Sequence, residues 1–147
     1  MKSSLLRDGV VAGTVAGALS GLPSTVHALV TGADPLAPAR AAGNLLLPAR
    51  ASSGALLAAG AGAHAVISVG WGTVLAVAVR RTPLRRSPTA AGLLVGAGIA
   101  ALDLGLLAHG PIGRRWPLVR ALPVGPQVAD HLAFGAVVGW VNARSPN

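Results

Sequence analysis

Four long apolar segments, each bounded by arginine or by proline and glycine, limit what this chain can fold into. They cover residues 9–31, 53–79, 88–109 and 122–141. A helix needs about 20 apolar residues to cross the hydrocarbon core of a bilayer, and each segment is long enough to do so. The sequence therefore predicts an all-α membrane protein, in which residues 1–147 form one transmembrane domain, a compact bundle of four transmembrane helices.

The composition agrees with a lipid environment. Hydrophobic residues make up 52% of the chain and charged residues only 11%, whereas soluble domains carry about 25% charged residues. The net charge of +8 does not indicate nucleic-acid binding, because the cations cluster between the apolar segments, where arginine meets lipid phosphate. The chain has no cysteine, which excludes disulfides, iron–sulfur clusters and thiolate zinc sites within it.

The distribution of basic residues gives the expected orientation. With four spans, the N-terminus, the second connection and the C-terminus share one side of the membrane. That side carries seven basic residues: Lys2, Arg7, Arg80, Arg81, Arg85, Arg86 and Arg144. The other side carries five: Arg40, Arg50, Arg114, Arg115 and Arg120. The positive-inside rule then predicts a multi-pass protein of the cell membrane with both termini in the cytoplasm.

The first 28 residues also resemble a signal peptide, which is an alternative to a first span. They begin with basic residues, continue with an apolar stretch and end in Val26, His27 and Ala28, with small residues at the positions that cleavage requires. Asp8 within the basic region and the long, glycine-rich apolar stretch favour an uncleaved span. Cleavage would leave three spans and remove His27.

The two outer connections are long, and we expect short helical segments at the membrane interface in both. In the first, Asp34 is the expected N-cap, with Pro35 behind it, and Pro48 is the expected stop. In the second, proline and glycine interrupt the chain around Trp116, a suitable anchor at headgroup level. Trp140 is expected to play the same part on the cytoplasmic side.

Three prolines lie in or at the ends of the apolar segments. Pro23 lies inside the first and predicts a kink, because proline cannot donate the helical backbone hydrogen bond. Pro88 and Pro126 suit first-turn positions, where the missing N–H has no intrahelical partner in any case.

Glycines recur every four residues within the segments. They are Gly9, Gly13, Gly17, Gly21, Gly92, Gly96, Gly135 and Gly139. Such spacing lets helix backbones approach closely, where van der Waals contact drives association. We expect these residues to pack helices, either within the chain or against a partner. The expected partners are the lipid bilayer and, through the glycine faces, a second copy or a larger membrane complex.

Polar side chains within the segments form the candidate site. They are Ser24, His27, His64, Ser68, Asp103, Gln127, Asp130 and His131. A central aspartate costs roughly 2.5–3.5 kcal/mol on insertion scales, so such groups face protein or water. At about 1.5 Å per residue, the ionisable members lie within roughly 6–17 Å of the same membrane boundary. Helical periodicity places them on inward faces, which predicts one polar cluster in the outer half of the bilayer.

Two functions are compatible with such a cluster. As a structural core, its hydrogen bonds would hold the helices together, each contributing about 0.6–2 kcal/mol, in a protein that serves as an accessory subunit of a membrane complex. As a ligand site, its carboxylates and imidazoles would bind a divalent transition metal or relay protons. Proton-coupled or small-solute transport by an oligomer is therefore the alternative function.

Enzymatic chemistry has little support in the sequence. It contains no nucleophile elbow, phosphate loop or cofactor fingerprint, so we predict no catalytic residue and no cofactor. Ser24, His27 and Asp103 leave an intramembrane hydrolase as a remote alternative. No HExxH or comparable spacing identifies metal ligands, and a transition metal stays an alternative without assigned residues.

Overall fold

The computed structural model describes residues 2–81 and 86–144, with side chains described for 5–78 and 86–144. Every regular element in these ranges is a helix, which confirms the all-α prediction. In chain order the elements are α1 Lys2–Ser20, α2 Leu22–Thr31, α3 Ala37–Gly43, α4 Ser53–Arg81, α5 Pro88–Ala100, the π-helix η2 Ala101–Ala108, the 3-10 helix η3 Pro111–Arg115, α6 Pro117–Arg120 and α7 Val124–Arg144. Arg85 and the side chains of Lys2, Arg80 and Arg81, which entered the orientation argument, lie outside the described parts.

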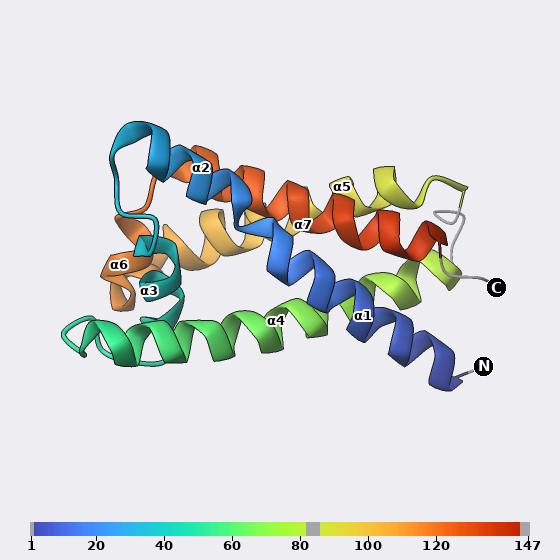
Figure 1. Cartoon of the computed structure of the whole chain (residues 1–147), viewed down its shortest axis with the longest axis horizontal. Helices are drawn as coiled ribbons and strands as arrows, with labels where there is room; N and C mark the ends of the chain where they lie inside the picture. Colours follow the sequence, from blue (N-terminus) through green and yellow to red (C-terminus); the bar gives the residue numbers. More distant parts are fainter. Residues whose placement is uncertain (1, 82–85, 145–147) are drawn as a thin grey trace.

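The long helices run side by side along the molecule (Figure 1). At one end α1 begins and α7 ends, and the short helices α3 and α6 lie at the other end. Within the described residues, three helical stretches are long and apolar enough to cross a membrane: Leu5–Thr31, Ser53–Ala78 and Pro88–Ala108. They match the first three predicted segments.

The fourth predicted segment forms α7 but is not among these apolar stretches. Its polar residues lower its hydropathy: Gln127, Asp130, His131 and Asn142. The position of α7 explains why it tolerates them. It packs against α1, α2, α4, α5 and η2, and residues 126–139 are all buried or half-buried. Because α7 faces protein, its sequence does not need the apolar character of a lipid-facing helix. That α7 spans the membrane stays a prediction.

Proline and glycine divide the first helix as expected. The helix is interrupted at Gly21, and Pro23 is the second residue of α2. This confirms the predicted kink, which follows from the missing N–H of proline. Pro88 is the first residue of α5 and Pro126 the third of α7, so both occupy first-turn positions.

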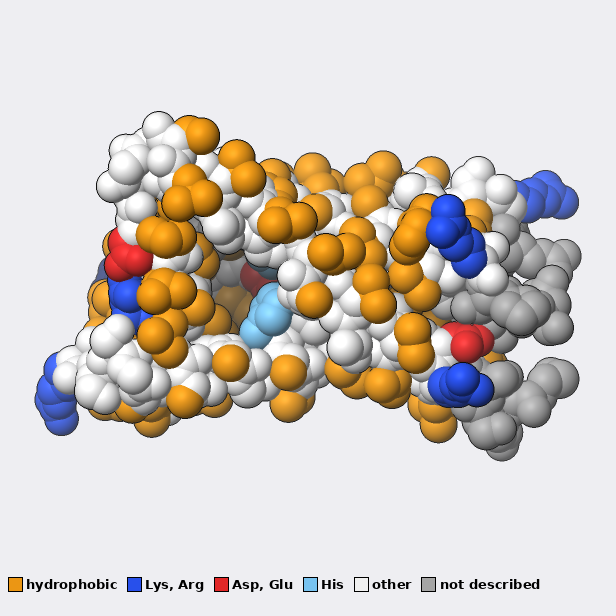
Figure 2. Space-filling model, in the orientation of Figure 1, with side chains coloured by type: hydrophobic (Ala, Val, Ile, Leu, Met, Phe, Trp, Pro, Cys, Tyr) orange, Lys and Arg blue, Asp and Glu red, His pale blue; other side chains and the backbone are white. Residues whose placement is uncertain are grey.

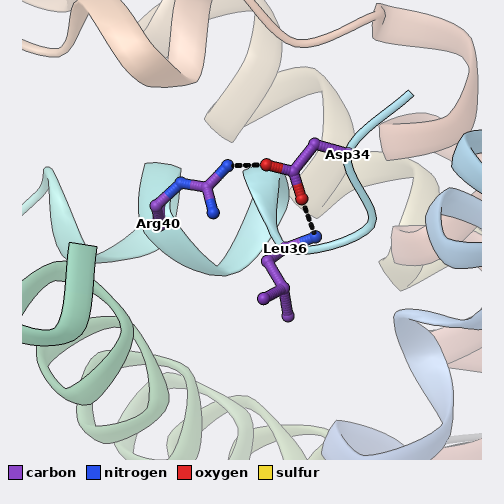
Figure 3. A network of polar contacts seen from close by, with 3 residues as sticks. All are labelled: Asp34, Leu36 and Arg40. Atoms are coloured by element: carbon purple, nitrogen blue, oxygen red, sulfur yellow. Dashed lines mark hydrogen bonds and ion pairs between the residues drawn. The ribbon is translucent and has the colours of Figure 1, made fainter.

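The first outer connection differs from its prediction. Asp34 is not the N-cap of α3; that position belongs to Leu36, and the helix ends at Gly43, before Pro48. The carboxylate instead turns the chain: its Oδ1 accepts the Leu36 N–H at 2.8 Å, and its Oδ2 pairs with Arg40 (Figure 3). Pro38 explains the shift, because it suits the first turn of a helix and here follows the first residue of α3.

The glycines selected from the sequence bring two pairs of helices into backbone contact. A Cβ atom on Gly13 of α1 would lie 2.5 Å from the carbonyl oxygen of Ser68 in α4. A Cβ atom on Gly92 of α5 would lie 2.0 Å from the carbonyl oxygen of Gly135 in α7. Of the eight glycines selected from the sequence, all except Gly21 lie against another helix of this chain in the same way. A side chain at these positions would force the helices apart.

This packing predicts a sharp difference between two glycines of α5. Gly92→Ala should lower the melting temperature in detergent, because overpacking costs about 1–3 kcal/mol and exceeds the gain of about 1 kcal/mol in helix propensity. Gly98→Ala is the matched control, since nothing lies within 4 Å of a Cβ atom there. It should leave the melting temperature unchanged or raise it. Equal melting temperatures, measured by circular dichroism, would contradict the α5–α7 contact.

Candidate functional site

Two consecutive residues of α7 bind two different helices. The Asp130 carboxylate accepts the backbone N–H of Ser24 at 2.9 Å through Oδ1 and the Ser24 hydroxyl through Oδ2. The His131 ring places Nε2 3.3 Å from Oδ2 of Asp103. Neighbouring residues of a helix point about 100° apart, so Asp130 faces α2 while His131 faces η2. One turn of α7 thereby joins both elements.

The break in the first helix explains the Ser24–Asp130 pair. Ser24 is the third residue of α2, and the first backbone N–H groups of any helix have no intrahelical acceptor; the first such bond here runs from Thr25 N–H to the Gly21 carbonyl. In lipid an unsatisfied backbone group costs several kcal/mol. A carboxylate also suits the positive end of a helix dipole. Asp130 therefore caps α2 from a neighbouring helix.

The Asp103–His131 pair holds a proton in a defined place. Nδ1 of His131 lies 2.7 Å from the backbone carbonyl of Gln127, and a carbonyl only accepts, so Nδ1 carries a hydrogen. Two arrangements then complete the contact with Asp103: a doubly protonated ring facing a carboxylate, or a neutral ring accepting from a protonated acid. Both keep one proton between the two side chains. Asp103 lies in η2, and π-helical turns are frequent at functional sites.

The other predicted site residues have separate partners. Nε2 of His64 donates to the Gly17 carbonyl at 2.8 Å across the α1–α4 contact, and Ser68 is buried against the same glycine. The Gln127 side-chain amide donates to the carbonyls of Leu122 and Pro123, which directly precede α7. Among the described residues, none forms a hydrogen bond with the His27 side chain. The backbone carbonyl of His27 accepts a hydrogen bond from the Thr31 hydroxyl.

Among the predicted site residues the structure thus shows two hydrogen-bonded pairs and one histidine–backbone contact, and His64 and His131 both lie near enough to act electrostatically on Asp130. Within residues 2–81 and 86–144, no group of three or more His, Cys, Asp or Glu side chains is arranged to hold a metal ion. Sequence reasoning missed the backbone partners, namely the Ser24 N–H and the carbonyls of Gly17 and Gln127. Pro23 was a usable signal for the first, because a kink in a membrane helix frees backbone groups that need a partner.

The surface separates charge from apolar side chains. Figure 2 shows arginine side chains gathered toward the two ends of the molecule, with mainly hydrophobic side chains covering the length between them. The same face is hollowed between α2 and α4, with a histidine side chain at the edge of the hollow and an acidic side chain in its floor. A polar hollow therefore interrupts an otherwise apolar face.

Comparisons with known proteins add no relative to this geometry. No protein-family model, curated protein or solved structure matches the chain. Its function therefore has to be argued from its own residues and their contacts.

Outside the apolar stretches, the Asp34–Arg40 pair gives a pH-dependent contact. The Arg40 side chain, and then the Leu36 N–H, hold the pKa of Asp34 below its ordinary 3.8. A lowered pKa in the folded state stabilises the fold above the unfolded pKa, and this contribution is lost as the pH falls through the lowered value.

Arg40→Ala should return the Asp34 pKa toward 3.8, as measured by a carbon-13 NMR titration. Arg50→Ala, in the same connection, is the control and should leave it unchanged; an equal Asp34 pKa in all three proteins would contradict the pair.

Proposed function

We propose that this chain is a four-span integral protein of the cell membrane whose Asp and His residues form a structural hydrogen-bonding core. The observation that supports this most is that each aspartate within the predicted spans already bonds another helical element. Asp130 of α7 caps α2, and Asp103 of η2 meets His131 of α7. Acids used in this way stabilise the helix arrangement.

Length and charge support four spans. At about 1.5 Å per residue, the 21 residues of α7 extend about 31 Å, close to the ~30 Å hydrocarbon core. The apolar surface between two charged ends (Figure 2) is the distribution of side chains expected of a membrane-spanning bundle. The excess of basic residues on the side of the termini favours a cytoplasmic location for that side.

In this proposal the protein acts as a small accessory subunit of a membrane complex. The glycine faces first expected to bind the partner are occupied within the chain, apart from Gly21. A partner or a second copy then has to use the outward surface. Gly54, Gly62 and Gly70 of α4 are exposed, with nothing within 4 Å of a Cβ atom, so the outer side of α4 permits close approach of another helix.

Transport or binding of a small solute is the second candidate. The hollow between α2 and α4 favours it, because a purely structural core leaves no reason for polar groups to be reachable from the outside of the bundle.

Cysteine labelling tests the topology directly, since the chain has no cysteine of its own. Single cysteines at Ser52 and Arg115 should react with a membrane-impermeant maleimide in intact cells. Cysteines at Ser87 and Ala143 should react only after permeabilisation. Labelling of position 143 from outside together with 52 and 115 would contradict the fourth span. Inversion at all four positions would keep four spans and overturn the orientation.

A double-mutant cycle tests the structural role. Ser24→Ala and Asp130→Asn should each lower thermal stability in detergent, and their effects should be non-additive by about 0.6–2 kcal/mol, the range for interhelical hydrogen bonds in membranes. Thr25→Ala is the matched control, because the Thr25 hydroxyl bonds the Gly21 carbonyl of its own chain segment. It should combine additively with Asp130→Asn. Additivity for Ser24→Ala as well would remove the support for a structural pair.

A further inference from the structure

The hollow between α2 and α4 contains hydrogen-bonding capacity that the structural core does not use. His64 of α4 has an exposed side chain, and the Asp130 side chain on α7 is only half-buried. The His64 imidazole is near enough to act electrostatically on the Asp130 carboxylate.

The unused positions on both groups are acceptors. An ionised carboxylate offers about four lone-pair sites, and Ser24 occupies one on each oxygen of Asp130. The His64 ring donates through Nε2 to the Gly17 carbonyl, which leaves Nδ1 of a neutral imidazole as an acceptor. A ligand for this site therefore has to bring hydrogen-bond donors.

The charge around the hollow selects a cation. The predicted spans contain no lysine or arginine. Within the predicted spans, the ionisable groups on the elements packed around Asp130 are His27 of α2, His64 of α4, Asp103 of η2 and His131 of α7, while Arg7, Asp8 and Arg144 lie nearer the ends of α1 and α7. The Asp103–His131 pair shares one proton and is neutral in total, so with neutral His27 and His64 an ionised Asp130 leaves the sum negative. At low dielectric its attraction for a positive charge is far stronger than in water.

The surroundings of the hollow are apolar. On α2 the side chains of Leu22, Val26 and Leu29 are exposed, and Ile67 is exposed on α4. In the proposed membrane placement, on which this inference rests, the hollow opens sideways into the lipid of the outer leaflet. A ligand that enters from there needs an alkyl chain as well as a charged end.

We propose that the hollow binds a primary alkylammonium amphiphile. Its ammonium group donates hydrogens to Asp130 and to Nδ1 of His64, and its alkyl chain lies in the lipid beside α2 and α4. A free lipophilic amine and the head group of phosphatidylethanolamine share this chemistry.

Calorimetric titration of the full chain in phosphatidylcholine nanodiscs tests the proposal, with empty nanodiscs as background. Dodecylammonium should bind saturably. Dodecyltrimethylammonium has the charge but no N–H donor and should bind at least ~10-fold more weakly, and dodecanol should not bind. In phosphatidylethanolamine nanodiscs, a weaker apparent affinity for dodecylammonium would assign the site to the lipid head group, and an unchanged affinity would assign it to a free amine.

Variants locate the site. Asp130→Asn should weaken dodecylammonium binding at least ~10-fold, and His64→Phe should also weaken it. His109→Phe is the control, because Nδ1 of His109 bonds the Leu104 carbonyl near the end of η2. If Asp130→Asn does not fold, His64→Phe carries the test. Folded wild type without saturable binding, or equal binding in every variant, would overturn the inference. Failure of the chain to insert into nanodiscs would overturn the membrane placement instead.

Discussion

The bond between Asp130 and the backbone of Ser24 is the interaction on which the arrangement of the helices depends. In a bilayer every backbone N–H and C=O needs a partner inside the protein, and the interruption at Gly21 and Pro23 leaves the first N–H groups of α2 without one. Asp130 supplies the acceptor from α7. This requirement accounts for an acid in the middle of α7, and for the burial of that helix among its neighbours.

The same need for backbone hydrogen-bond partners explains the contacts of three histidine side chains. His64 bonds the Gly17 carbonyl, His131 the Gln127 carbonyl and His109 the Leu104 carbonyl, so three imidazoles serve backbone oxygens. For His64 the approach requires a residue without a side chain at position 17, where a Cβ atom would lie 2.9 Å from Ser68. Glycine spacing and polar placement are therefore parts of one packing solution, in which small residues expose backbone that polar side chains can reach.

The sequence predicted the features that depend on local chemistry. Apolar length located the helices, and Pro23, Pro88 and Pro126 marked a break and two first turns. Features that depend on helix rotation were not predictable: Asp130 and His131 are adjacent in the chain, yet they bind α2 and η2 separately. Residue types also give no sign of backbone partners, which is why the sequence did not show which polar groups form hydrogen bonds with each other and which form them with the backbone. The Asp34 N-cap was wrong because Asp34 instead makes a turn and an ion pair.

The structural role and the ligand role meet at Asp130 and are therefore linked. The carboxylate that caps α2 also lies near enough to His64 of α4 for the two side chains to interact electrostatically. An ammonium group at Asp130 would share its oxygens with Ser24 and so alter how firmly α2 is held. Thermodynamic linkage then makes two free energies equal: the one by which the bound cation shifts the position of α2, and the one by which the position of α2 changes the affinity for the cation. Gly21, between α1 and α2, is exposed, and no atom lies within 4 Å of a Cβ atom built there. Packing at this residue therefore does not prevent α2 from moving relative to α1, and α2 is the element on which such coupling would act.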